Sequence, residues 1–113
     1  MDTAETTSIA CTIGALDARE QARRRDLAAR MHAATRQTRE LPDGYAFRYP
    51  VDLYLAIAEF IALERRCCPF FRFVLEVEPD GGPLWLRLTG RPGVKAFIQT
   101  ELGLGLESGG AGA

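Results

Sequence analysis

Two alternating segments in the C-terminal half constrain the fold of this chain more than any other feature. Apolar residues occupy every second position from 71 to 77 and again from 84 to 88, which predicts two β-strands that each bury one face. The segment between them, 79–83, reads Pro-Asp-Gly-Gly-Pro and is rich in turn-forming residues. The sequence therefore predicts an antiparallel hairpin with one apolar face.

Three helices are predicted around this hairpin. Asp17 and Glu20 have the spacing of a capping box, which starts a helix near residue 18, and we expect that helix to run to about residue 38. A second helix is expected over 52–67, and its broad apolar face makes it the central core helix. A third, shorter helix is expected over 92–102.

Two further strands complete the predicted order. Residues 8–13 are partly β-branched and residues 45–49 alternate in polarity, so both are interpreted as strands. The order is then β-α-β-α-β-β-α, an α+β domain with a small mixed sheet and helices packed mainly on one face. We expect a single domain over 9–102, a flexible arm over 1–8 and a disordered Gly-rich tail over 103–113.

Composition excludes several classes of function. The 113 residues include one histidine, His32, and the only serines are Ser8 and Ser108. The chain therefore has too few of these residues to favour a serine–histidine–acid triad or a histidine-rich metal site. A net charge of −1 argues against broad electrostatic binding of nucleic acid. No apolar stretch is long enough to cross a bilayer, and no secretory signal is visible. We therefore expect a cytoplasmic protein that binds neither membranes nor nucleic acid.

The three cysteines, Cys11, Cys67 and Cys68, are the main candidates for chemistry. An odd number without a signal peptide fits a reduced protein better than a disulfide scaffold. Pro69 ends the helix at Cys68, which places the adjacent pair at a helix–strand break. Reduced thiols are soft ligands that prefer ions such as Hg(II), As(III), Cu(I) or Zn(II). If the first strand lies beside the strand that begins at Phe71, Cys11 completes a three-thiolate site, which suits trigonal ions and leaves tetrahedral zinc one ligand short.

Two electrostatic effects oppose each other at the cysteine pair. The C-terminal end of a helix carries partial negative charge, which disfavours a thiolate. Arg65, Arg66 and Arg72 are close in sequence and favour one. The sequence leaves this balance open.

Two alternatives to simple ligand binding remain. Free cysteine is among the most buried residue types, so the thiols could be core packing in a protein–protein interaction or homodimerisation module. Glu64 precedes the pair by one helical turn, and it could act as the proton donor of a thiolate enzyme of the organomercurial-lyase type. It could equally pair with an arginine on a solvated face.

Segment 64–71 reads Glu-Arg-Arg-Cys-Cys-Pro-Phe-Phe. Together with Cys11 upstream and a hairpin downstream, it resembles a family of small bacterial domains with an E-x-x-C-C-P-F-F signature. These domains occur alone or appended to MerR-type metal-responsive regulators, and the resemblance covers roughly residues 9–102. It implies a role in heavy-metal resistance, with a soft metal or a small thiol-reactive ligand bound at Cys11, Cys67 and Cys68. The chain has no room for a winged-helix DNA-binding domain, so we expect a free-standing binding or buffering role.

Overall fold

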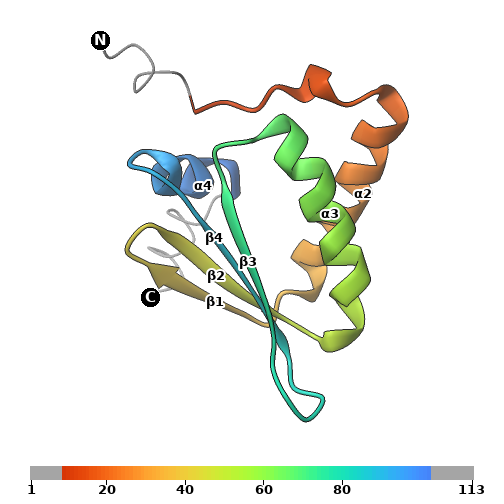
Figure 1. The fold of residues 1–113 in the computed structure, drawn as a ribbon, viewed down its shortest axis with the longest axis vertical. Coiled ribbons are helices and arrows are strands. Elements are labelled where there is room, and N and C mark those ends of the chain that lie inside the picture. The colour runs from red at the N-terminus through yellow and green to blue at the C-terminus, as the bar shows by residue number, and fades with distance from the viewer. Residues whose placement is uncertain (1–8, 103–113) are drawn as a thin grey trace.

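The computed structural model describes residues 9–102, which form three α-helices, two short 3-10 helices and a four-stranded sheet. The α-helices are α2 (Ala18–Ala34), α3 (Tyr54–Cys67) and α4 (Val94–Leu102), and the 3-10 helices are η1 (Ile13–Ala15) and η2 (Val51–Leu53). The strands are β1 (Gln37–Leu41), β2 (Gly44–Tyr49), β3 (Arg72–Val77) and β4 (Leu84–Thr89). Figure 1 shows α2 and α3 side by side on one side of the sheet, with α4 near the end where β3 begins.

The sheet is antiparallel throughout, in the order β1-β2-β4-β3. Its register places Phe47 opposite Leu86 and Leu86 opposite Leu75, so the apolar residues of three strands share one face. Trp85 and Arg87 alternate with them on the other face. This one-sided pattern is the reason that the helices gather in a single layer.

The core lies between the inner sheet face and the helices. Each α-helix contributes a buried residue to it: Met31 from α2, Ile57 from α3 and Ile98 from α4. The predicted capping box is present at the start of α2, where Asp17 accepts a 2.8 Å hydrogen bond from the Glu20 backbone and Glu20 accepts one of 3.0 Å in return.

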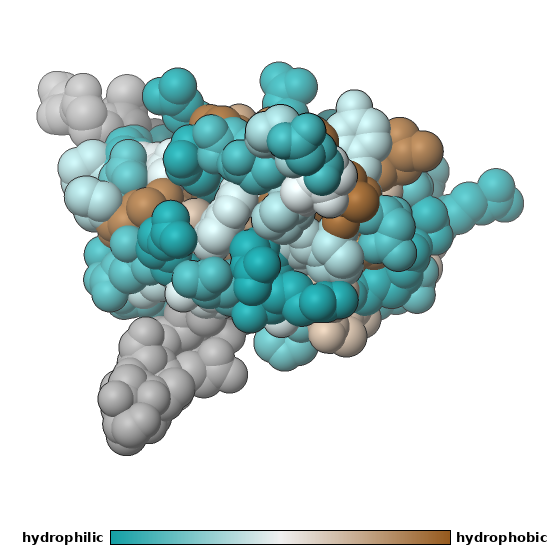
Figure 2. Space-filling view, turned by 90° about the horizontal axis from the view of Figure 1, so that it is seen from below, coloured by the Kyte–Doolittle hydropathy of each residue, from teal (hydrophilic) through white to brown (hydrophobic). Residues whose placement is uncertain are grey.

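The surface seen from below in the view of Figure 1, the side of the turn between β3 and β4, is mostly hydrophilic, with small separate hydrophobic patches (Figure 2). Large exposed hydrophobic side chains include Val51, Tyr54 and Leu55 around the start of α3, and Val77 at the end of β3. Within residues 9–102, no helix combines the length and the apolar content that a membrane span requires.

The predicted α+β class and the one-sided helix layer are confirmed, and the three helices and strands β2, β3 and β4 follow the predicted order. The prediction of a strand over 8–13 was wrong for residues 9–13, the part of this segment that the structure describes. Residues 9–12 form no strand and η1 follows them, because Thr12 donates a 2.6 Å backbone hydrogen bond to Cys67 at the end of α3 instead of pairing at a sheet edge. The arm over 1–8 and the tail over 103–113 lie outside the described residues.

Strand β1 was not predicted. The first long helix ends at Ala34 and not near residue 38, because Thr35 adopts an extended backbone with ψ 122°. Residues 37–41 then pair with β2 across the turn that begins after Leu41. The sheet is therefore wholly antiparallel and not mixed.

Gly44 lies where β2 passes closest to β4, and an added Cβ would overlap the Leu88 carbonyl oxygen and approach the Thr89 Cα to 2.8 Å. We expect Gly44→Ala to lower the free energy of unfolding by roughly 1–3 kcal/mol. Gly14→Ala is the control, because nothing lies within 4 Å of its added methyl, and it should change stability by less than about 0.5 kcal/mol. Urea unfolding followed by circular dichroism measures both, and equal losses would contradict the close approach.

Candidate thiol and metal site

Three sulfur atoms meet where α3 ends. Cys67 is the last residue of α3, and Cys68 leaves the helix with φ −129° and ψ 71°. Cys11 reaches the same place from the segment before η1, and the three Sγ atoms all lie within 4.8 Å of one another. The structure thus brings together all three cysteines that the sequence named, although Cys11 comes from an irregular segment and not from a strand.

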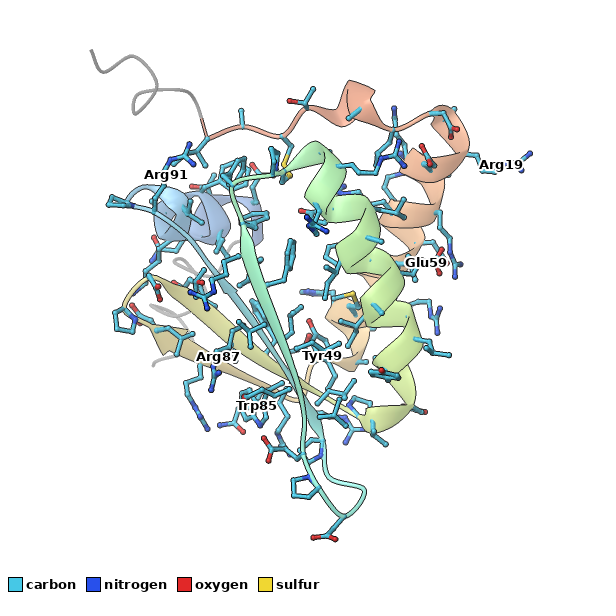
Figure 3. All side chains as sticks on the ribbon, viewed as in Figure 1. Arg19, Tyr49, Glu59, Trp85, Arg87 and Arg91 are labelled. Carbon is cyan, nitrogen blue, oxygen red and sulfur yellow. A yellow bond between two sulfur atoms is a disulfide. The ribbon has the colours of Figure 1, made fainter. Side chains whose placement is uncertain are left out.

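Cys11 and Cys68 form a disulfide, visible in Figure 3 as the yellow bond at the end of α3. Their Cα atoms are 4.5 Å apart, within the range for such bonds. The expectation of three free thiols was therefore wrong, because Cys67 alone is free. The linked residues are separated by 57 positions, and closing a loop of that length stabilises a fold by about 4 kcal/mol in the chain-entropy account. The bond holds the segment before η1 against α3.

The three sulfurs differ in their exposure. Cys67 and Cys68 are both 0% exposed, whereas Cys11 is half-buried. Leu16 joins the two buried cysteines in a small apolar cluster, against which Leu63 and other partly buried residues pack. A reagent arriving from solvent therefore meets Cys11 first.

A partly buried ion pair adjoins Cys67. Glu64 is only 6% exposed and accepts a 2.5 Å hydrogen bond from Arg24 Nε of α2. The Cys67 Sγ atom lies 3.9 Å from the same Glu64 oxygen and 3.8 Å from the Cys68 Sγ atom. Both roles considered for Glu64 thus have a structural counterpart, because it lies beside a thiol and it pairs with an arginine. The Glu64 carboxylate is buried and not on a solvated face, whereas Arg24 is partly exposed.

Burial decides whether Cys67 is a thiol or a thiolate, a question that the sequence left open. Burial raises the pKa of the Cys67 thiol above its ordinary value of 9.0, and the Glu64 carboxylate raises this pKa further. Arg24 acts in the opposite direction and does not outweigh them. Cys67 is therefore a protonated thiol at neutral pH.

Arg24 is the functional residue that sequence reasoning missed. It is 40 positions from Glu64, and no local spacing rule connects residues so far apart. Arg66, which the sequence proposed as a neighbour of the thiols, instead donates hydrogen bonds to Glu20 at 2.6 Å and to the Ala15 carbonyl at 3.0 Å. It fastens the start of α2 and η1 to the end of α3.

A cavity of about 430 Å³ adjoins the cysteine site, between the helices and the inner sheet face. Cys11, Arg24 and Glu64 line it where it meets the sulfur cluster. Figure 3 shows Tyr49, another lining residue, in the space between the sheet and the helices, whereas Trp85 points away from it. The apolar walls include Met31, Phe47, Phe60, Leu86, Phe97 and Ile98.

Comparison with protein-family models, with curated proteins and with solved structures finds no match. The resemblance to the E-x-x-C-C-P-F-F family therefore stays a prediction from the motif. Any function has to be argued from the geometry of the site.

Removing Arg24 leaves the buried Glu64 carboxylate without its partner. We expect Arg24→Met to lower the free energy of unfolding by about 2–4 kcal/mol. The double variant Arg24→Met/Glu64→Met should recover part of that loss, because two apolar side chains can then pack together. Arg30→Met, at an exposed position of the same helix, is the control. A double variant no more stable than Arg24→Met in urea would contradict this account.

The raised pKa of Cys67 makes its contribution to stability depend on pH. Because the folded state holds the thiol proton more tightly than the unfolded state, the stabilisation is complete below about pH 9 and is lost as pH rises through the folded-state pKa. We expect the difference in free energy of unfolding between the wild type and Cys67→Ala to be constant at lower pH and to shrink as pH rises above about 9. Urea unfolding at a series of pH values measures it, and a constant difference would show that the two states share one thiol pKa.

Proposed function

We propose that the chain, once reduced, binds a soft metal or metalloid ion through Cys11, Cys67 and Cys68. The observation that carries this proposal is the gathering of three sulfurs within 4.8 Å. Three sulfurs held at about 2.3 Å from one trigonal ion lie about 4 Å apart. The Cys11–Cys68 bond therefore has to open and its two sulfurs have to separate by only about 2 Å.

Reduction of the disulfide comes first in this proposal. A dithiol reductant attacks the half-buried Cys11 sulfur, Cys68 leaves as a thiolate and takes up a proton, and the second thiol of the reductant then releases Cys11. Two electrons and two protons pass to the protein, and the reductant becomes a disulfide. A cytoplasmic location would supply such a reductant, so the open, reduced form of the site would be the one that meets the ion.

Trivalent arsenic fits the site best among the soft ions considered. Three thiols replace the three hydroxyl groups of arsenite and release three waters, which gives a product without net charge. A neutral product suits this site, because Cys67 and Cys68 are fully buried and burying a charge is costly. Hg(II) is the second candidate, because it is also thiophilic and accepts few ligands.

An interaction or homodimerisation module with cysteines that only pack is a second candidate function. Val51, Tyr54 and Leu55 favour it, because they lie close together along the chain and are 42%, 46% and 75% exposed. Under this alternative, replacing the thiols lowers stability without affecting any ligand.

Arsenite titration of the reduced protein separates the two functions. After treatment with a phosphine reductant, which brings no competing thiol, we expect the wild type to bind one As(III) per chain in calorimetry. Cys67→Ser/Cys68→Ser should not saturate over the same concentrations, and the oxidised wild type, with Cys11 and Cys68 joined, is the matched control that should not bind. Equal stoichiometry and affinity in the reduced wild type and the double variant would overturn the proposal in favour of the packing role. Hg(II) is titrated in parallel.

A further inference from the structure

We infer that the cavity beside the cysteines receives the organic group of the bound compound. The ligands of the site would then be trivalent soft-atom compounds that carry an apolar substituent, with the soft atom on the thiols and the substituent between the sheet and the helices. This inference rests on the proposed function and adds to it the chemical class of the ligand.

The cavity follows one face of α2 away from the cysteines. Arg24, Ala28 and Met31 line it, and their spacing places them on one side of α2. Thr35, which directly follows α2, lines it too. The distance along the helix from Arg24 to its last residue, Ala34, is about 15 Å at 1.5 Å per residue. An elongated or aromatic group attached to an atom at Cys11 would therefore extend along the face of α2.

One small side chain of α2, that of Ala28, helps to leave this space open, because the other α2 residues that line it, Arg24, Met31 and His32, are large. Ala28 is half-buried and faces the cavity, where a larger residue would fill the gap between the layers. Aromatic rings from β2, α3 and α4, those of Phe47, Phe60 and Phe97, form walls around it. Protein interiors are normally packed with few voids, and a volume of about 430 Å³ lies within the range of small-molecule sites.

The charges around the cavity favour an uncharged ligand. Arg24 and Glu64 line the cavity where it meets Cys11, and their opposite charges compensate each other through a direct hydrogen bond. The other titratable lining residues with a formal or partial charge, His32 and Glu101, are exposed. They lie on α2 and α4.

An aryl arsenical tests this inference against inorganic arsenite. A hydrated phenylarsenic(III) compound gives up its two hydroxyl groups to two thiols and releases two waters, while its arsenic–carbon bond stays intact. Ala28→Leu narrows the cavity without touching a sulfur, and Ala29→Leu makes the same change at an exposed position of α2. Calorimetry of the three reduced proteins, the wild type and the two variants, with phenylarsine oxide and with arsenite gives the six affinities to compare.

We expect Ala28→Leu to weaken phenylarsenic binding by roughly tenfold or more, the effect of losing burial for an apolar ring. Arsenite affinity should change less than about twofold, and Ala29→Leu should leave both affinities at the wild-type value. Equal effects of Ala28→Leu on the two compounds would overturn the inference and leave the proposed function standing. A wild type that binds neither compound would overturn both.

A second measurement uses the wild type alone, so it does not depend on whether a variant folds. In the reduced wild type, phenylarsenic(III) should bind roughly tenfold or more tightly than methylarsenic(III), after correction for the same ratio with a small free dithiol. The correction removes the intrinsic difference between the two compounds. A corrected ratio near unity would show that the cavity does not receive the organic group.

Discussion

Pro69 disfavours helical geometry at the residue before it, and α3 ends at Cys67 and the chain turns at Cys68. Two adjacent cysteines thereby obtain different surroundings. Cys67 keeps its place on the helix, beside Glu64, while Cys68 turns toward Cys11. Had the helix continued, neighbouring side chains would diverge by about 100° around its axis, and the sulfurs would not form one cluster with Cys11. The disulfide, the position of the segment before η1 and the proposed ion site all depend on this break.

The site combines two features that act against each other. Burial holds the Cys67 thiol protonated by raising its pKa, which makes it a poor nucleophile. The same burial places the sulfurs of Cys67 and Cys68, which are soft ligands, where little water reaches them. They lie beside Arg24 and Glu64, whose opposite charges compensate each other. Such an arrangement favours binding of a neutral compound over thiolate catalysis. The half-buried Cys11 provides the access that the other two sulfurs lack.

The predictions from sequence succeeded where a pattern is local and failed where a distant partner decides. The alternation around the turn at 79–83 defined β3 and β4, and the capping box defined the start of α2. The segment at 9–12 was interpreted as a strand from its β-branched residues, but its hydrogen bond goes to the end of α3. Strand β1 was missed because its exposed, polar residues carry no apolar alternation, and its pairing with β2 decides its conformation.

The sequence by itself determined that this is an α+β domain whose only concentrated chemistry lies in three cysteines, because apolar periodicity and residue scarcity are properties of the chain alone. Only the tertiary structure decided that Cys11 is linked to Cys68, that Arg24 compensates Glu64 and that a cavity adjoins them. Each of these depends on atoms from elements far apart in sequence. Their distances are set by how the helices pack on the sheet, and no local pattern encodes that packing.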